Sequence, residues 1–450
     1  MEKESKLGVF SYLDGWEPSG ILTMNEDNTQ VLSSAFSYGS KYLDRINAIE
    51  IDPVSLSLND KAGIKHKALN PFGGMTYFGG IRDAAPDSWG RRVIESKLKA
   101  PPDSLNESVY LIHAGSNRVG SLDIRSSIND KPREGEVNWA NLEYLMEAAA
   151  RIDEGLPIPA SLEVVYANGS ALGGGRPKAS IRDELGVQYL AKFSGVKDPY
   201  SIPDIEMATM RLASICGLTV PAVRVVQLGT KRVMMIRRFD RYFSKGQQSL
   251  NMTEMLTSMP GTGYMEKRLP FVSGLTMLNC HESDSPKKSY SDLASAIKKH
   301  CHTSVIKDDQ RELYGRMIYN ILVSNDDDHL RNHGFVLDPN IKGWRLSPLY
   351  DVMPRPSLAY DRNLHLSIGD HGRMATINNA LTSHVLFDLS LEAAEEIVDR
   401  IYKHVREWKV YFESFGVQEK DIKLIDSAFR KMDDIRKNEY KTKTKHGLKY

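Results

Sequence analysis

The chain has 450 residues and a formal net charge of +1 at pH 7, with hydrophobic and charged fractions that are ordinary for a globular protein. Its length predicts two or three domains. The near-neutral charge argues against nucleic-acid binding by the whole chain, which needs a strongly basic surface, but leaves local basic patches open. Three cysteines are too few for a disulfide framework, and neither a secretory signal nor a membrane-spanning apolar run is recognisable. We therefore expect a cytoplasmic protein without a membrane partner.

The first part of the chain, residues 1–125, is expected to form a β-rich subdomain. Residues 7–12 are typical of a short strand, and residues 87–95 predict a compact helix. Residues 126–137 are polar, charged and interrupted by proline and glycine, which predicts a linker.

Two further regions follow, a small β-lobe at 138–248 and a helical lobe at 249–450. In the β-lobe, residues 205–215 carry apolar side chains at helical spacing, and Gly217 is suited to end that helix. In the helical lobe the periodicity is mainly that of helices, as at 313–323. Short apolar runs predict strands in the β-lobe at 162–166, 178–182, 187–193, 222–228 and 232–237. This layout predicts an α+β protein with a nucleotide bound between the two lobes.

A glycine-rich segment, residues 169–178, separates two of the predicted strands. Glycines allow backbone N–H groups to approach phosphates closely, and Ser170 and Lys178 add donors. Taken alone, such a segment is more typical of a hairpin turn. It lacks the Gly-x4-Gly-Lys-Ser/Thr order, so a P-loop NTPase is disfavoured.

Lys192 alternates onto one face of a mainly apolar strand, and Glu206 lies fourteen residues later in the predicted helix. A strand lysine that binds phosphates and is positioned by a helix glutamate recurs in kinases. A lysine that reaches solvent and a glutamate favoured by the helix dipole form the alternative. Residues 238–241, Arg-Phe-Asp-Arg, follow the last strand, where a hinge would contact adenine; a charged exit from the strand is the alternative.

The most informative stretch is residues 324–332, Ser-Asn-Asp-Asp-Asp-His-Leu-Arg-Asn, directly after an apolar helical run. Asp351 lies nineteen residues after Asn332, at the end of a short apolar segment. Phosphoryl transfer needs one group to orient the acceptor hydroxyl and two oxygen ligands for Mg²⁺. We therefore predict a kinase in which one aspartate of the triplet 326–328 faces the acceptor, while Asn332 and Asp351 bind the metal.

Other charged or metal-binding side chains in the sequence allow more than one interpretation. His329 and Arg331 either neutralise phosphate charge or fix the conformation of their loop. An EF-hand is excluded because its sixth position, counted from Asp326, is Arg331 instead of glycine; a solvated charged turn remains an alternative. Cys280-His281 and residues 300–302 have zinc-ligand side chains, but adjacent residues rarely chelate one ion.

Together these motifs resemble the HipA family of bacterial serine/threonine kinases, the toxins of HipBA-type toxin–antitoxin modules. Residues 325–333 are similar to the family's Asn-x-Asp-x-His-x-Lys-Asn loop and are followed by Pro-Leu-Tyr-Asp at 348–351. Residues 173–178, Gly-Gly-Gly-Arg-Pro-Lys, resemble its Gly-Gly-Ala-Arg-Pro-Lys loop. Residues 78–92 resemble a segment of its N-terminal subdomain, Leu-Pro-Asp-x-Trp-Gly-Arg-Arg. The resemblance covers nearly the whole chain.

The resemblance implies a protein-kinase-like bilobal α+β fold that uses ATP and Mg²⁺, with a fused β-rich N-terminal subdomain. It implies that Asp327 is the catalytic carboxylate and that Asn332 and Asp351 are the Mg²⁺ ligands. Residues of both lobes would bind ATP, namely Lys192, Gly173, Gly174, Gly175, Lys178, Phe239, His329 and Arg331.

The resemblance also implies a protein substrate and a HipB-like helix-turn-helix antitoxin, through which DNA is contacted only indirectly. Substrates of relatives include aminoacyl-tRNA synthetases. Ala171 stands at the family's autophosphorylated serine, so either Ser170 takes the phosphate or this form of self-inactivation is absent. Two alternative functions remain, a non-catalytic nucleotide sensor that acts through its partner and a kinase of a small-molecule hydroxyl.

The end of the chain is basic. Residues 430–450 carry eight Lys or Arg against three acids, which predicts a solvated end or a contact with nucleic acid or a partner. The sequence does not identify the substrate, the antitoxin, the oligomeric state or toxicity in cells.

Overall fold

A computed structural model of the chain describes residues 2–133, 135, 138–163, 166, 174–195, 198–246 and 248–436. The chain divides into two compact units. Unit 1 contains Met1–Pro199, Pro221–His281 and Gly334–Ser347, and unit 2 contains Tyr200–Val220, Glu282–His333 and Pro348–Tyr450. Each unit is therefore assembled from segments that are far apart in the sequence. No helix among the described residues is long and apolar enough to cross a membrane.

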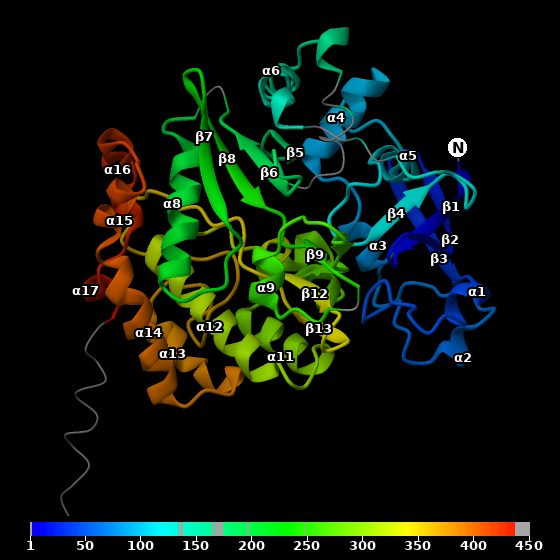
Figure 1. Cartoon of the computed structure of the whole chain (residues 1–450). Coiled ribbons are helices and arrows are strands. Elements are labelled where there is room, and N and C mark those ends of the chain that lie inside the picture. The colour runs from blue at the N-terminus through cyan, green and yellow to red at the C-terminus, as the bar shows by residue number, and fades with distance from the viewer. Residues whose placement is uncertain are drawn as a thin grey trace, which may run out of the picture. The chain divides into compact units, whose positions relative to one another are not determined.

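Unit 1 begins with an antiparallel sheet of strand order β3-β2-β1-β4 (Figure 1). Its strands are β1 (Glu2–Tyr12), β2 (Trp16–Asp27), β3 (Gln30–Tyr38) and β4 (Leu122–Arg125). Alternate side chains of β2, such as Leu22 and Met24, are buried because successive residues of a strand point to opposite faces. They pack with Phe36 and Phe78 in one core. The accompanying helices are α1 (Ser40–Leu43), α2 (Lys61–Ile64), α3 (Gly79–Asp83), α4 (Ser88–Leu98) and α5 (Glu107–His113).

A second antiparallel sheet of unit 1 has the order β5-β6-β8-β7. Its strands are β5 (Lys178–Arg182), β6 (Gln188–Phe193), β7 (Val223–Leu228) and β8 (Lys231–Arg237). The amphipathic helix α6 (Leu142–Asp153) contributes Leu145 and Ile152 to a core that also holds Ala191 and Val233 of the sheet. Trp89 of α4 also belongs to this core, so α4 packs against the second sheet although it lies between β3 and β4 of the first sheet in the sequence.

Smaller elements complete unit 1. Strand β9 (Arg241–Ser244) pairs with β10 (Met265–Arg268). Strands β11 (Phe271–Ser273), β12 (Gly334–Asp338) and β13 (Gly343–Leu346) form a three-stranded sheet. Two short helices, α9 (Met252–Thr257) and α10 (Gly274–Met277), lie in the same stretch of chain.

Unit 2 is helical. Helix α12 (Ile306–Val323) is buried continuously from Leu313 to its end, and α11 (Tyr290–His300) and α14 (Leu391–Val405) pack against it. Helix α11 begins at a capping box of Ser289 and Asp292, and Ser390 caps α14, so polar side chains satisfy free N–H groups at both starts. The remaining helices are α8 (Ile202–Ile215), α13 (Ile377–Thr382), α15 (Trp408–Ser414), α16 (Glu419–Ile425) and α17 (Met432–Ile435).

Most predicted elements are confirmed. The strands expected at 178–182, 187–193, 222–228 and 232–237 are β5 to β8, with ends within one residue. Gly217 follows α8 with φ of +82°, as a C′ glycine should. The strand predicted at 162–166 is wrong at its start, because Leu162 closes the 3-10 turn Ala160–Leu162 and packs into the core with α6. Strands β10 to β13 also interrupt the region that was predicted to be helical.

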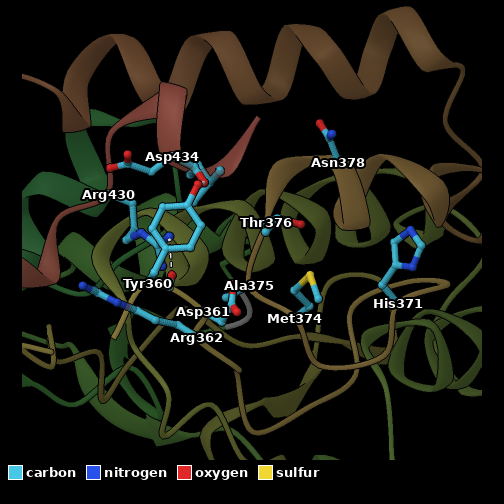
Figure 2. Close-up of a pocket in the computed structure, with 11 residues that line it drawn as sticks. Tyr360, Asp361, Arg362, His371, Met374, Ala375, Thr376, Asn378, Arg430 and Asp434 are labelled. Carbon is cyan, nitrogen blue, oxygen red and sulfur yellow. Dashed lines mark hydrogen bonds between the residues drawn. The ribbon is translucent and has the colours of Figure 1, made fainter. Parts of the chain in front are cut away.

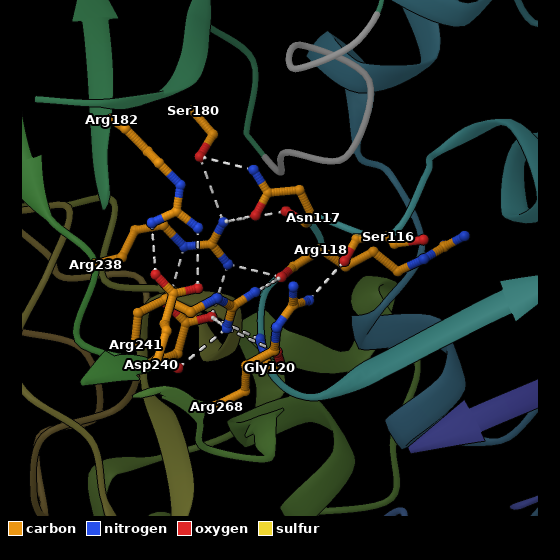
Figure 3. A network of polar contacts seen from close by, with 11 residues as sticks. Ser116, Asn117, Arg118, Gly120, Ser180, Arg182, Arg238, Asp240, Arg241 and Arg268 are labelled. Atoms are coloured by element: carbon orange, nitrogen blue, oxygen red, sulfur yellow. Dashed lines mark hydrogen bonds and ion pairs between the residues drawn. The ribbon is translucent and has the colours of Figure 1, made fainter. Parts of the chain in front are cut away.

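A buried ion network ties two distant segments of unit 1 together. Figure 3 shows Arg238 and Arg241 converging on the carboxylate of Asp240. Arg238 Nη2 lies 2.8 Å from Asp240 Oδ2 and 2.6 Å from the carbonyl oxygen of Arg118. The backbone N–H of Gly120 donates to the same carboxylate at 2.7 Å. The loop before β4 is thus fastened to the turn between β8 and β9.

Burial by itself would raise the pKa of Asp240, but the two guanidinium groups beside it hold that pKa well below its usual range. A carboxylate with a lowered pKa stabilises the folded state at neutral pH. That contribution is lost as the pH falls below about 4, where the unfolded carboxylate binds its proton first. The Arg-Phe-Asp-Arg motif is therefore largely a structural ion network.

We expect Asp240→Ala to lower the free energy of unfolding by about 3–5 kcal/mol, because it leaves two buried arginines without their carboxylate. Urea unfolding of the full chain at pH 7 measures this change. The control is Asp44→Ala, which removes an exposed partner of Lys65 and should cost about 1 kcal/mol or less. Equal losses in the two variants would contradict the structural role of the network.

Candidate active site

The loop of three aspartates begins where α12 ends. Ser324 adopts a left-handed conformation, with φ of +52°, and its N–H bonds back to the helix. Its hydroxyl donates to the carbonyl oxygen of Ala428 at 2.6 Å. Asn325 is buried and its amide donates to the side-chain oxygen of Asn320 at 3.1 Å. The chain therefore leaves the helix in a single fixed direction.

The third aspartate of the triplet, Asp328, points into the interior. It is 1% exposed, and its carboxylate accepts a hydrogen bond from the Tyr290 hydroxyl at 2.6 Å. Its other oxygen accepts from the backbone N–H of His365 at 2.6 Å. Asn320 of α12 donates in turn to the Tyr290 hydroxyl at 2.9 Å. Asp328 thus joins α11, α12 and the segment that follows Asp351.

Burial raises the pKa of Asp328 to about 7, although the hydrogen bonds from Tyr290 and His365 lower it in part. Burial likewise lowers the pKa of His333, the residue after the loop, to about 3, so this ring is neutral at pH 7. Its ring lies edge-on to Tyr290 at 5.4 Å between centroids. The inner side of the loop is therefore a compact layer of polar groups in which burial disfavours the charged forms of both side chains.

Asp326 and Asp327 lie on the outer side of the loop. Arg355 bridges them, with guanidinium nitrogens 2.9 Å from a carboxylate oxygen of each. Asp327 is about half exposed, and its Oδ1 lies 3.8 Å from Nε2 of His329. The His329 ring in turn lies edge-on to His365 at 5.8 Å. The structure therefore separates three aspartates that residue types and spacing alone left equivalent: Asp326 and Asp327 are accessible, whereas Asp328 is buried.

The predicted metal ligands are held close to this loop. Asn332 ends a short 3-10 turn (Leu330–Asn332) and its amide nitrogen donates to the carbonyl oxygen of Asp327 at 2.8 Å. The Tyr350 hydroxyl donates to the carbonyl oxygen of Arg331 at 2.6 Å, which brings the segment ending at Asp351 against the loop. Arg331 itself forms an ion pair with Glu282.

Asp351 adopts a left-handed conformation with φ of +58°, uncommon for a residue with a side chain. Such backbone conformations are concentrated at functional sites. Within the described part of the chain, no three or more His, Cys, Asp or Glu side chains are grouped as a metal site. A site made of one carboxylate and one amide, as predicted here, has too few such side chains to form that kind of group.

In unit 1, the end of the glycine-rich segment is clamped by helix α4. The N–H of Gly174 donates to Asp87 at 3.0 Å, and its carbonyl oxygen accepts from the N–H of Trp89 at 3.0 Å. The indole N–H of Trp89 donates to the carbonyl oxygen of Lys178 at 2.8 Å, and Arg92 donates to that of Gly175 at 2.6 Å. Gly174 has φ of +83°, and a Cβ there would collide with the Lys178 ammonium group. Ser170 and Gly173 lie outside the described residues.

Lys178 and Lys192 occupy directly opposed positions on β5 and β6, and both are largely buried. Like charges opposite one another on neighbouring strands repel. The two lysines therefore place two positive charges side by side on this sheet.

Phe239 lies between β8 and β9 and is partly buried against Phe271, at 6.1 Å between ring centroids. Its predicted contact with adenine stays a prediction.

Several important residues were not found by reading the sequence. Tyr290 and His365 lie outside every motif, and only their hydrogen bonds to Asp328 identify them. The roles of Asp87 and Trp89 could have been suspected, since their segment resembles a family motif, but that motif implied only an N-terminal subdomain. Its function as a clamp on the glycine-rich segment depends on contacts between residues far apart in the chain.

Comparison with known proteins places the chain among kinase-like proteins. The family described as the HipA-like C-terminal domain matches residues 170–409. A serine/threonine-protein kinase toxin HipA of Shewanella oneidensis is 26% identical over 33% of this chain and 33% of its own length. A Haemophilus influenzae protein named as a candidate kinase is 28% identical over 38% of this chain and 47% of its own length. The matches thus span less than half of either relative.

A solved structure of Shewanella oneidensis HipA, in a complex with HipB and operator DNA, resembles the chain with a TM-score of 0.60. It is 15% identical, and the match covers 94% of each chain. The predicted kinase-like α+β fold is thereby confirmed. Because the family match extends over more than half of the sequence, the chain belongs to the HipA family.

The raised pKa of Asp328 makes stability depend on pH. The folded state retains the proton up to about pH 7, whereas an unfolded aspartate loses it near pH 4, so this contribution is full below pH 4 and declines as the pH rises to 7. We expect Asp328→Asn to remove a slope of about 1.4 kcal/mol per pH unit in that range. Urea unfolding at several pH values measures it. Asp326→Asn, on the exposed side, should leave the slope unchanged, and a loss of slope there instead would contradict the assignment.

Proposed function

We propose that the chain is an ATP- and Mg²⁺-dependent serine/threonine kinase that acts in the cytoplasm on a bacterial protein. The observation that carries the proposal is the division of labour in the aspartate loop. Asp328 is buried and holds the loop, so that Asp327 is presented on its accessible side beside Asn332. A kinase needs a carboxylate that is held in a fixed loop and is accessible to the acceptor hydroxyl, and Asp327 meets both conditions. Aminoacyl-tRNA synthetases are the first substrates to test.

Asp327 would accept a hydrogen bond from the acceptor hydroxyl and take its proton as the new phosphate ester forms. In the resting loop its carboxylate is paired with Arg355, which is itself more than half exposed. Exposed ion pairs contribute only about 0–1 kcal/mol, so an acceptor can displace Arg355 at little cost. His329 lies beside the same carboxylate and can neutralise charge on a phosphate group.

Asn332 and Asp351 would hold Mg²⁺. The Asn332 amide nitrogen is committed to the Asp327 carbonyl, which leaves the amide oxygen for a hard cation. Amide and carboxylate oxygens are the ligands that Mg²⁺ accepts. When bound, the metal would neutralise phosphate charge as the phosphoryl group moves. The donor set of this loop therefore fits the group.

The opposed lysines of β5 and β6 support ATP binding by unit 1. Lys192 and Lys178 are fixed opposite one another on a rigid sheet, and their ammonium groups can donate charge-assisted hydrogen bonds to a phosphate chain. Gly174, whose own N–H is committed to Asp87, and Gly175 belong to a segment that α4 fixes, and the backbone N–H of Gly175 is the proposed further donor. Gly173, Phe239 and Arg331 complete the proposed ATP-binding set.

A HipB-like helix-turn-helix antitoxin is the proposed partner, with DNA reached only through it. The solved HipA complex contains HipB and operator DNA, and the shared fold supports the same kind of assembly here. A nucleotide sensor that works only through such a partner would not need a reactive carboxylate. The decisive variants therefore concern Asp327 and Lys192.

We expect Asp327→Asn to lower the rate of phosphate transfer from labelled ATP by about 10²–10⁴-fold, since the acceptor loses its proton acceptor. ATP binding should be retained, because the amide keeps the shape of the carboxylate. Asp326→Asn is the matched control and should lose far less activity. Equal transfer by the Asp327 variant and the intact chain would refute the kinase mechanism. If the intact chain binds ATP but transfers no phosphate, the nucleotide-sensor alternative is favoured.

We expect Lys192→Met to weaken ATP binding by about tenfold or more, which corresponds to the loss of one charge-assisted hydrogen bond of about 1.5–3 kcal/mol. Equilibrium titration with ATP and Mg²⁺ measures the change. Lys231→Met is the control, since Lys231 is exposed at the start of β8 in the same sheet. Similar affinities for the two variants would exclude Lys192 from the nucleotide site.

A further inference from the structure

A loop of unit 2, residues 355–362, is tied at both ends to the residue that ends helix α12. The backbone N–H of Arg355 donates to the carbonyl oxygen of Ser324 at 3.2 Å. At the other end of the loop, Arg362 Nη1 donates to the Ser324 hydroxyl at 2.6 Å. Ser324 precedes Asp327 by three residues. The 355–362 loop and the loop of three aspartates therefore share one anchor.

The guanidinium group of Arg362 also binds the backbone of the 355–362 loop. Its Nη2 donates to the carbonyl oxygen of Ser357 at 2.7 Å, and its Nε donates to that of Ala359 at 3.1 Å. Arg362 and Tyr360 line a cavity of about 250 Å³, and Figure 2 shows Arg430 close to the Tyr360 ring. The backbone of Ser357 is therefore in direct contact with a guanidinium group.

The first residue of the loop, Arg355, contacts the candidate catalytic carboxylate. Its Nη2 lies 2.9 Å from Asp327 Oδ2, and its Nε lies 2.9 Å from Asp326 Oδ1. One guanidinium group thus gives one nitrogen to each of two carboxylates. Because the Arg355 N–H is bonded to Ser324, the side chain can turn away while its backbone stays in place. Asp327 Oδ2 must lose Arg355 before it can accept a hydrogen bond from an acceptor hydroxyl.

Ser357 lies two residues after Arg355, on an accessible part of the same loop. Ser357 is partly exposed, and the next residue, Leu358, is 99% exposed. The Ser357 hydroxyl accepts a hydrogen bond from the N–H of Ala359 at 3.1 Å, an exchangeable contact at the surface. Another protein molecule can therefore reach this hydroxyl.

A phosphate on Ser357 would compete with the aspartates for Arg355. A phosphoserine carries a charge of about −1.5 to −2 at pH 7 and three acceptor oxygens, and arginine binds it through two nitrogens at once. The Cα atoms of Ser357 and Arg355 are at most about 7 Å apart, and Arg362 already bonds to the Ser357 backbone. Asp361 of the same loop is exposed, so water screens its charge. New arginine–phosphate pairs of this kind are a general means by which phosphorylation rearranges a loop.

We propose that Ser357 is a phosphorylation site and that its phosphate raises kinase activity by drawing Arg355 away from Asp327. The step rests on the proposed kinase activity, with one copy of the chain acting on another. The Ser357 Oγ forms a bond to the γ-phosphorus of ATP as the bond to the β,γ-bridging oxygen breaks. The hydroxyl proton passes to the Asp327 carboxylate of the copy that acts as the enzyme, and ADP leaves.

The test uses the Asp327→Asn chain as the acceptor, since it carries Ser357 but lacks the proposed catalytic carboxylate. The intact chain is incubated with this acceptor, labelled ATP and Mg²⁺, and mass spectrometry maps the label, which we expect on Ser357 of the acceptor. An enzyme copy that was phosphorylated beforehand should label the acceptor about threefold to tenfold faster than a Ser357→Ala enzyme, the gain expected from releasing two exposed ion pairs. Ser304→Ala is the matched control, because Ser304 is an exposed serine of unit 2 outside the loop, and this enzyme should be activated like the intact chain.

A second variant tests the role of Arg355 in the Ser357→Ala enzyme. Adding Arg355→Met should raise the initial rate by the same threefold to tenfold, because it frees Asp327 without any phosphate. Arg406→Met is the matched control and should leave the rate unchanged, since Arg406 is similarly exposed and pairs with Glu407 instead.

An unchanged or lower rate with Arg355→Met would overturn the inference and leave the kinase standing. Label found only at other residues of the acceptor, or only on lysate proteins, would do the same. Absence of transfer both to the acceptor copy and to lysate proteins would refute the inference together with the kinase activity.

Discussion

The buried carboxylate of Asp328 is the interaction on which unit 2 depends. It receives hydrogen bonds from α11, through Tyr290, and from the backbone of the segment after Asp351. Through Asn320, α12 is tied to the same centre. Burying an acid is costly unless its hydrogen bonds are made or it takes up a proton, and its pKa of about 7 reflects that balance. The loop conformation that exposes Asp327 follows from where Asp328 must lie.

Unit 1 uses two clamps of a similar kind. The Asp-x-Trp segment of α4 holds the glycine-rich segment by its backbone, so Gly174 is fixed at both its N–H and its carbonyl oxygen. The second clamp, formed by Arg238, Asp240 and Arg241, fastens the loop before β4. In both cases residues that resemble family motifs act on the backbone of another segment. Their role is to hold the backbone of that segment in place, and the first clamp holds Gly174 and Gly175, which are proposed to contact ATP.

Local patterning was sufficient for most of the fold. Period-2 apolar runs located β5 to β8, because half-buried antiparallel strands must alternate. The strand predicted from Leu162 was wrong for a physical reason. Leu162 is buried against α6 at the end of a 3-10 turn, and a single buried apolar residue does not distinguish a turn from a strand. The short strands β10 to β13 contain too few residues for a period to be recognised.

The sequence predicted which loop contains the candidate site, but it did not predict how the side chains of that loop are arranged in space. Residue types and spacing identified the triplet 326–328, Asn332 and Asp351, and the family resemblance singled out Asp327, but neither predicted that Asp328 is buried. That distinction rests on Tyr290, which comes 38 residues before Asp328 in the sequence. Contacts between distant residues leave no local pattern, so only the folded chain reveals them.

The two aspartates of the loop also differ in how firmly they are held. Asp327 is paired with Arg355 in an exposed ion pair, which is weak because water competes for both charges. Asp328 is enclosed, and breaking its hydrogen bonds would leave buried donors without an acceptor, at a cost of about 1–3 kcal/mol each. A catalytic loop needs this asymmetry. The group that must exchange partners during turnover is loosely held, whereas the group that fixes the geometry is bound on every side.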